Sequence, residues 1–261
     1  MVVQAEEGRL TTSSARILVA TAVPVERDAV ASAFPEPGAE ASRPGVLLRR
    51  FPGGWDLLAA GVGPALAAAS TASALTAAAL DGAPYDLVVS TGIGGGFAPD
   101  APVGSLVVAD EITAADLGAE TADGFLPVTD LGFGTVTHRP PAGLVRRVAD
   151  ATGARPGTVL TGSTVTGTAG RAALLRARHP RALAEAMEGF GVAEAAAAHA
   201  VPVLELRAVS NPVGPRDRAA WRIGDALAAL TDAFGKLAPV LTSWNHHDPH
   251  DPHDPDDPHG L

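Results

Sequence analysis

The sequence predicts a three-layer α/β/α fold built around a central, mostly parallel mixed sheet. The chain has 261 residues, of which 46% are hydrophobic, so it can bury a sizeable core. Short apolar runs rich in Val and Leu alternate with Ala-rich helical segments. Repetition of strand, helix and strand places successive strands in parallel and covers both faces of the sheet with helices.

Each element is expected from its local pattern. Buried strands are expected at 16–23, 46–51, 55–60, 85–92, 104–116, 157–161 and 201–210. Helices are expected at 25–34, 64–80, 144–153, 191–200 and 224–244. The helix at 64–80 begins at Pro64 and ends near Gly82, which are the usual places of Pro and Gly at helix ends. The segment 180–189, PRALAEAMEG, has the propensity of a helix.

The organisation along the chain is expected to be simple. Residues 15–244 contain no clear linker and are expected to form one domain. Residues 1–14 are polar and unpatterned, and the DPH repeats of 245–261 are rich in Asp and Pro, so both ends are expected to be disordered. Five of the eight histidines lie in this C-terminal segment. Weak metal binding there is the alternative to simple solvation.

Composition excludes several classes of function. The formal net charge is −10, and an acidic chain is a poor binder of nucleic acid, which needs clustered Lys and Arg. There is no Cys, which excludes disulfides, thiolate metal sites and cysteine nucleophiles. No signal-peptide pattern and no run long enough to span a bilayer are present, so a cytoplasmic protein with no membrane partner is expected. No metal site and no cofactor are expected either.

Candidate site residues follow the predicted strands, because ligands in such sheets gather at the carboxyl ends of strands. Glu26 follows the first strand, and GIGGG follows the strand that begins at residue 85. The last strand is expected to stop at Asn211, since Pro212 has no N–H to donate. An Asn before a Pro is also a common turn starter, so a turn is the alternative for Asn211.

The glycine-rich TGIGGGF lets the backbone approach a ligand closely. It is not a dinucleotide fingerprint, because Phe97 stands where the third glycine would be. It is not a phosphate-binding P-loop either, since no Gly-Lys-Ser/Thr follows. A glycine turn that lets two elements pack remains the alternative.

Two carboxylates are candidates, each with a structural alternative. Glu26 could simply favour a helix N-terminus by its charge. Glu188, in EAMEGFG, could be a solvated helix carboxylate. That solvated role is expected more strongly for Glu185 and Glu194, which are flanked by Ala in an ordinary helical context. The two candidates matter only if the fold brings them together.

The ordered set of motifs resembles the nucleoside phosphorylase/hydrolase superfamily, and within it the nucleosidases that cleave methylthioadenosine and S-adenosylhomocysteine. The resemblance runs from about residue 16 to residue 240. It rests on ATAVPVERDAV, AGVGPALAAAS, DLVVSTGIGGG, VGSLVVADEI, EAMEGFGVAEAAA and RAVSNPVG, in that order. It implies a phosphorylase/hydrolase-like fold, and a strand rather than a helix just before the Met-Glu pair.

The resemblance also implies catalytic roles. Glu26 takes the place of the carboxylate that activates the attacking water, which is a general-base role. Met187 and Glu188 take the places of the pair that holds the ribose, with Glu188 on the hydroxyls. Asn211 stands where the methylthioadenosine enzymes carry an Asp that protonates purine N7.

Substrate-binding roles follow in the same way. Val165 and Thr166 fall on the segment whose backbone reads the base, and Trp221 falls on an aromatic residue at the ribose 5′ side. Gly92 and Ile93 belong to the glycine-rich loop beside the sugar. The resemblance thus implies a small-molecule nucleoside as the partner.

Asn211 is the first departure from the nucleosidase pattern. An amide can donate to O6 and accept from N7–H, a two-point pairing that suits a 6-oxopurine better than adenine. Enzymes of this superfamily that act on inosine or guanosine are similar in using Asn there. A hypoxanthine-type base is therefore expected.

The phosphate site is the second departure. Related bacterial phosphorylases hold phosphate with an Arg and a Ser around the glycine loop, where this sequence has Ser90 and Ile93. Loss of the cation disfavours an anion and favours water as the nucleophile. A hydrolase for a 6-oxopurine nucleoside on this scaffold resembles the futalosine hydrolases of the alternative menaquinone pathway.

The benzoate of futalosine calls for an arginine. Arg216, Arg218 and Arg222 stand beside Trp221, although a solvated loop is the alternative for them. The other functions considered are a 6-oxopurine nucleoside phosphorylase, a methylthioadenosine-type nucleosidase and a non-enzymatic nucleoside sensor. Relatives of this kind form dimers or larger rings, so a homo-oligomer is expected.

Overall fold

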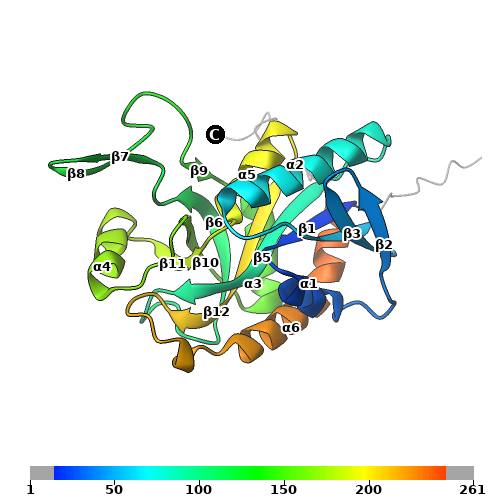
Figure 1. The fold of residues 1–261 in the computed structure, drawn as a ribbon. Coiled ribbons are helices and arrows are strands. Elements are labelled where there is room, and N and C mark those ends of the chain that lie inside the picture. The colour runs from blue at the N-terminus through cyan, green and yellow to red at the C-terminus, as the bar shows by residue number, and fades with distance from the viewer. Residues whose placement is uncertain (1–14, 245–261) are drawn as a thin grey trace, which may run out of the picture.

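The computed structural model describes residues 15–244 and contains strands and helices in alternation (Figure 1). The expectations for 1–14 and 245–261 fall outside the described residues. The strands are β1 Ile17–Thr21, β2 Ala39–Arg43, β3 Val46–Phe51, β4 Trp55–Ala59, β5 Leu87–Gly96, β6 Leu106–Ala114, β7 Gly118–Thr121, β8 Gly124–Pro127, β9 Thr137–His138, β10 Arg155–Thr161, β11 Ala182–Ala186 and β12 Val203–Pro212. The helices are α1 Pro24–Ala31, α2 Pro64–Leu80, α3 Ala142–Thr152, α4 Ala169–Arg178, α5 Gly189–Ala198, the short 3₁₀ helix η1 Arg218–Ala220 and α6 Ile223–Thr242.

The main sheet is mixed, as predicted. Its strand order is β11-β10-β6-β12-β5-β1-β4-β3-β2, with β9 on β6. Strand β1 pairs in parallel with both of its neighbours in the sheet, β4 and β5. Antiparallel pairings come from the β2–β3–β4 meander and from the places where β12 meets β6 and β11 meets β5. The last of these pairings closes part of the sheet on itself.

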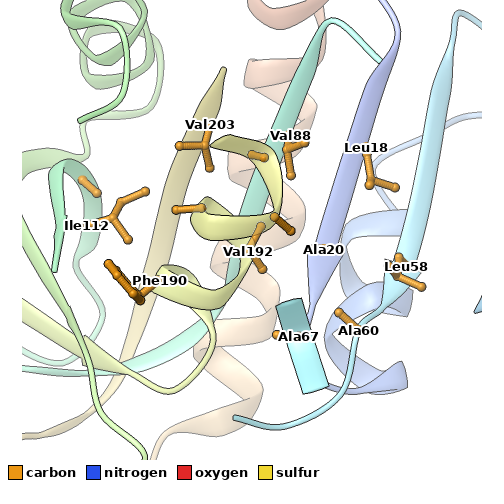
Figure 2. Close-up of a cluster of buried hydrophobic side chains, with 14 of the residues drawn as sticks. Leu18, Ala20, Leu58, Ala60, Ala67, Val88, Ile112, Phe190, Val192 and Val203 are labelled. Carbon is orange, nitrogen blue, oxygen red and sulfur yellow. The ribbon is translucent and has the colours of Figure 1, made fainter. Parts of the chain in front are cut away.

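Helices cover both faces of the sheet, which makes the predicted three layers. Helices α2 and α5 pack against each other on one face, whereas α1 and α3 both pack against α6 on the other (Figure 1). Alternating side chains of each strand supply the two cores. In β1, Leu18 and Ala20 face the α2–α5 side with Val88 and Val192 (Figure 2), whereas Val19 faces the α6 side.

Some elements differ from their prediction. The segment 180–189 is not a helix: β11 occupies Ala182–Ala186, as the resemblance implies and against local propensity. All five residues of β11 are buried between neighbouring strands, so tertiary packing outweighs their helix propensity. The sequence did not predict β2, α4 or the β7–β8 hairpin. In α4 only Leu175 is buried, so this helix has no apolar stripe to reveal it.

Among the described residues, the helices are all too short or too polar to cross a bilayer. The described part of the chain likewise holds no group of His, Asp and Glu side chains arranged to bind a metal.

Candidate active site

A cavity of about 220 Å³ opens at the carboxyl ends of several strands. Its walls come from the turn after β1, the end of β5, the end of β11 and the end of β12. It is lined by Ala22, Val23, Glu26, Val62, Ile93, Gly94, Gly95, Val165, Thr166, Glu185, Ala186, Met187, Glu188, Ser210, Asn211, Pro212, Gly214, Pro215, Arg216 and Trp221. Nine of the predicted site residues are in this set; Gly92 and Arg218 are not.

Glu26 lies in the first turn of α1, as predicted, but its carboxylate is buried rather than solvated. One oxygen accepts the N–H groups of Ala22 and Val23 at 3.0 and 3.3 Å. The other oxygen accepts the Ile93 N–H at 2.9 Å. Helix α1 and the glycine-rich end of β5 thus fix the carboxylate from two sides, as a general base requires.

Glu188 is also buried, which rules out the solvated role for it. It occupies the N-cap position of α5, and its carboxylate accepts the Gly63 N–H at 3.2 Å and the Met187 N–H at 3.3 Å, both from outside the helix. Its backbone follows β11, so the strand aims Met187 and Glu188 into the cavity. The fold therefore brings the two carboxylates, Glu26 and Glu188, to one cavity.

A buried guanidinium joins them. Arg207, on β12, is fully buried. Its Nε donates to Glu205 at 2.8 Å and its Nη2 donates to the Ser90 hydroxyl at 2.9 Å. Its Nη1 lies 3.7 Å from a Glu188 oxygen, which is an ion pair but too long for a hydrogen bond. Nη1 has no hydrogen-bond partner among the described residues, and Arg207 does not line the cavity, so its charge acts on Glu188 and Glu26 from behind them.

The electrostatics of this cluster favour a role of Glu26 as a general base. Burial raises the pKa of Glu26 above its ordinary value, while the Ile93 N–H and the charge of Arg207 act in the opposite direction. Burial also raises the pKa of Glu205, against the pull of Arg207. Three carboxylates face one guanidinium, which leaves an excess of acidic groups beside the cavity. Such a site stabilises positive charge and disfavours a second anion.

Gly92 does not line the cavity but lies behind Glu26. Its φ is +150°, and a Cβ there would stand 2.7 Å from a Glu26 oxygen and 3.0 Å from Arg207 Nη1. The missing side chain leaves room for the carboxylate and the guanidinium. A contact of Gly92 with substrate stays a prediction.

Asn211 lines the cavity, but β12 does not stop there as the sequence predicts. The strand continues through Pro212, and a register shift around Ser210 lets Asn211 pair with Gly95. The Asn211 amide donates to the Pro212 carbonyl at 3.1 Å and accepts from the Ser210 hydroxyl at 2.9 Å. An amide has two N–H groups and two lone pairs, so one of each remains for a ligand.

Glu185 is a correction to the sequence interpretation. It was expected on a solvated helix, yet it lies on β11, is 6% exposed and lines the cavity. It accepts the Thr166 N–H at 3.0 Å and the Thr166 hydroxyl at 2.7 Å. The Thr166 N–H is therefore already engaged. Glu194 keeps the solvated helix role expected of it, with a hydrogen bond of 2.8 Å to His138.

Trp221 and Arg216 lie together at the cavity wall. The Arg216 guanidinium stands 5.2 Å from the centre of the Trp221 ring, and that of Arg218 stands 5.9 Å from it. Arg218 does not line the cavity, and Arg222 pairs with Asp225 instead. Of the three arginines considered, Arg216 alone reaches the site.

The sequence analysis missed Glu205 and Arg207. A signal for them exists, because the two charged residues stand two apart in an otherwise apolar strand and must share one face. Charges in a fully buried strand need partners. The sequence indicates that Glu205 and Arg207 pair with each other, but it does not show that Arg207 also lies near Glu188 and Glu26.

Comparisons with known proteins agree with this geometry. The family model described as "Phosphorylase superfamily" matches residues 16–242. A futalosine hydrolase from Streptomyces coelicolor is 86% identical over 232 residues, which are 89% of this chain and 99% of that protein. A second futalosine hydrolase, from Acidothermus cellulolyticus, is 45% identical over 86% of this chain and 91% of its own length.

Solved structures share the fold. A 5′-methylthioadenosine/S-adenosylhomocysteine nucleosidase from Neisseria meningitidis, in complex with methylthio-immucillin-A, has a TM-score of 0.74 at 19% identity and covers 87% of this chain and 99% of its own. A futalosine hydrolase mutant of Helicobacter pylori has a TM-score of 0.73 at 17% identity, covering 87% of this chain and 100% of its own. At these identities the likeness concerns the fold alone.

Proposed function

The chain belongs to the phosphorylase superfamily, and we propose that it hydrolyses the N-glycosidic bond of futalosine, releasing hypoxanthine and dehypoxanthinyl futalosine for menaquinone biosynthesis. The two futalosine hydrolases described above support this substrate, since the chain matches nearly the whole length of each. The observation that carries the reaction type is the buried acidic cluster at the cavity, in which Glu26 and Glu188 meet the free Nη1 of Arg207.

Glu26 is the proposed general base. Cleavage of the bond between sugar and purine passes through an oxocarbenium-like sugar, which a water molecule then attacks. Glu26 is held by three backbone N–H groups and has a raised pKa, so it is a stronger proton acceptor than an ordinary glutamate. It takes one proton from the attacking water.

Glu188 holds and stabilises the sugar in this proposal, with Arg207 behind it. Glu188 accepts hydrogen bonds from the ribose hydroxyls and, with Glu26, places negative charge near the developing cation. Met187 packs against the sugar beside it. Arg207 does not line the cavity and acts through Glu188 and Glu26, while Ser90 and Glu205 keep its guanidinium in place.

Asn211 is the proposed reader of the leaving base. Its spare N–H donates to O6 of hypoxanthine, and its spare lone pair accepts the hydrogen on N7. The base leaves with the electron pair of the broken bond and takes a proton at N7 from solvent, which balances the proton that Glu26 receives from the attacking water. The pairing with Asn211 stabilises the resulting neutral, N7-protonated hypoxanthine. Val165 and Thr166 form the wall of the cavity along the same base.

Arg216 is the proposed partner of the substrate carboxylate. The benzoate of futalosine extends from the ribose 5′ side, where Trp221 offers an aromatic face and Arg216 a guanidinium. Arg218 stands behind the same ring and adds positive charge there without reaching the cavity.

Water rather than phosphate is the proposed nucleophile. Ser90, which stands where related phosphorylases have an arginine, is fully buried and engaged by Arg207. The charge of Arg207 is matched by Glu205 and Glu188, so it is not available to neutralise a phosphate. An anion at the sugar would meet the excess of carboxylates.

The experiment is to incubate the protein with futalosine, inosine and methylthioadenosine, each with and without phosphate, and to identify the products by mass. Release of hypoxanthine from futalosine, unchanged by phosphate, is the expected result. A sugar 1-phosphate would establish a phosphorylase instead, and preferential release of adenine from methylthioadenosine would establish the other nucleosidase activity.

We further propose that the chain works as a homo-oligomer whose neighbour closes the 5′ end of the cavity. Val62 lines the cavity yet is 53% exposed, and Leu66, at the start of α2, is 55% exposed. Apolar side chains of this kind at the edge of a site suit a subunit contact. The cytoplasmic location stays a prediction from the sequence.

A further inference from the structure

We propose that Glu185 determines the specificity for a 6-oxopurine by accepting the N1–H of the base, at the edge next to the one that Asn211 reads. This inference rests on the proposed function, which supplies hypoxanthine as the leaving group. It adds a second reader of the base, which the sequence pattern did not indicate.

The sheet register places the two residues on either side of one glycine. Asn211 of β12 pairs with Gly95 of β5, and Glu185 of β11 pairs with the same Gly95 from the other side. This is possible because β5 runs past the last residue with which β1 pairs, Ser90, so β11 takes up its free edge. Two strand spacings separate Glu185 from Asn211 at their backbones, which is about 10 Å.

The side chains of directly paired residues lie on the same face of a sheet. Glu185 and Asn211 therefore project to one side, and both line the cavity. Gly95 has no side chain between them, and a Cβ at that position would come within 3.3 Å of Asn211 Nδ2. The result is a gap with a carboxylate on one side and an amide on the other, into which a flat base fits edge-on.

Glu185 also changes the hydrogen-bonding character of the neighbouring loop. The Thr166 N–H and hydroxyl both donate to the Glu185 carboxylate, so neither of these hydrogens is offered to a ligand. The carboxylate oxygens keep lone pairs of their own, because two oxygens have about four acceptor sites and Thr166 supplies two hydrogens. The wall therefore presents acceptors to the base in place of a donor.

This acceptor distinguishes the two purine classes. Hypoxanthine carries a hydrogen on N1, whereas N1 of adenine has only a lone pair. An acceptor at N1 favours the first base and leaves two acceptors facing each other with the second. Asn211 and Glu185 would thus select the same base at two separate edges, one at O6 and N7 and the other at N1.

The test is direct calorimetric binding of three free bases: hypoxanthine, adenine and 1-deazahypoxanthine, in which C–H replaces N1–H. We expect the wild-type protein to bind hypoxanthine roughly 10 to 100 times more tightly than the 1-deaza base, since one hydrogen bond to a charged group has that effect. In Glu185→Ala the two bases should bind about equally well. Glu194→Gln, on the solvated face of α5, should keep the wild-type ratio.

The ratio of the dissociation constants of 1-deazahypoxanthine and hypoxanthine distinguishes recognition of the base by Glu185 from support of the Thr166 loop. If Glu185 only supported the Thr166 loop, its removal would weaken the binding of both bases by the same factor. The proposal is therefore overturned if the ratio of the two dissociation constants is unchanged in Glu185→Ala, or if this ratio is near one in the wild-type protein. Glu185→Gln, which keeps an acceptor for Thr166, provides a second variant should Glu185→Ala fail to fold, and it should also lower the ratio. Failure of the proposed function is seen separately, as the absence of hypoxanthine release from futalosine by the wild-type protein.

Discussion

At the scale of single residues, the site is held together by compensation of buried charge. Glu26, Glu188 and Glu205 would each be costly to bury alone, and Arg207 lies among them with no exposed surface. Backbone N–H groups complete the partners of Glu26 and Glu188. The arrangement places acidic side chains beside the cavity, where burial raises the pKa of Glu26 and of Glu205 against the pull of Arg207.

Glu26→Gln should lower kcat for futalosine hydrolysis by about 10² to 10⁴, because the amide cannot accept a proton from water. The binding of hypoxanthine should change little, since Glu26 faces the sugar in the proposed complex. Steady-state kinetics and calorimetry on the same preparation measure both. The matched control is Glu36→Gln, an exposed carboxylate just beyond α1. More than a tenth of wild-type turnover in Glu26→Gln would reduce Glu26 to a structural residue.

The pH dependence of kcat should show an ionisation at the raised pKa of Glu26. The base acts only when ionised, so activity should fall as the pH is lowered through its pKa. Burial raises that pKa, so the fall should lie above the ordinary glutamate range of about 4.3. A pH–rate profile between mildly acidic and neutral pH measures it. A profile that stays flat down to the ordinary value would contradict the assignment.

Arg207→Met should destabilise the fold by about 3–5 kcal/mol in the free energy of unfolding, because it leaves Glu205 and Glu188 buried without their cation. Denaturation in urea, followed by circular dichroism, measures the loss. Arg222→Met is the control, since its partner Asp225 is exposed and surface pairs contribute at most about 1 kcal/mol. An equal decrease in the free energy of unfolding of the two variants would mean that the buried ion pairs of Arg207 stabilise the protein no more than a surface pair does.

At the scale of elements, strand ends decide where the chemistry is. Strands β1, β5, β11 and β12 each deliver the residues that follow or end them to one cavity. The glycine-rich end of β5 is central, because the Glu26 carboxylate, Glu185 and Asn211 all approach it closely. The glycine turn that was the structural alternative for TGIGGGF is therefore also part of the site.

Gly92→Ala should impair catalysis by displacing Glu26, since the new Cβ would stand 2.7 Å from its carboxylate oxygen. The positive φ adds backbone strain of about 1–2 kcal/mol. We expect a loss of kcat of at least about tenfold, which steady-state kinetics measures. Gly235→Ala, on the exposed side of α6 with open space at its Cβ, should keep full activity and gain up to about 1 kcal/mol of stability. Full activity in Gly92→Ala would show that the Glu26 carboxylate can accommodate a side chain at position 92 without losing its function.

At the scale of the whole molecule, the two helical layers leave the cavity at one edge of the sheet, with exposed apolar residues near it. Val25, Val62 and Leu66 are each more than half exposed. They follow β1 and β4, two parallel neighbours whose carboxyl ends meet at this edge. A subunit contact there would cover them and shield the sugar from bulk water.

Sedimentation equilibrium at micromolar concentration should therefore give a dimer or a larger assembly. Leu66→Glu should shift the chain towards the monomer and raise KM, because it places a charge in the contact that closes the 5′ end. Leu174→Glu, at a more exposed leucine on α4, should leave both properties unchanged. A wild-type monomer with full activity would contradict the proposal that a neighbouring subunit closes the cavity.

The sequence by itself determined the layered α/β architecture, most of its strands and helices, and the superfamily, because these depend on local apolar periodicity and on the order of motifs along the chain. It also pointed to three residues that line the cavity: Glu26 and Asn211 from their places at predicted strand ends, and Glu188 from the Met-Glu motif of the resemblance. The weaker predictions concern segments whose local signal is ambiguous, such as β11, where helix-forming residues are buried in the sheet.

Only the tertiary structure decided what surrounds these residues. That Arg207 meets Glu188, that Gly92 makes room for Glu26, and that Glu185 and Asn211 flank Gly95 all depend on strands that are distant in sequence and adjacent in the sheet. Charge compensation and hydrogen-bond partners are properties of such long-range neighbours. A local pattern cannot contain them, because the same Glu on a helix surface and on a buried strand has the same sequence context.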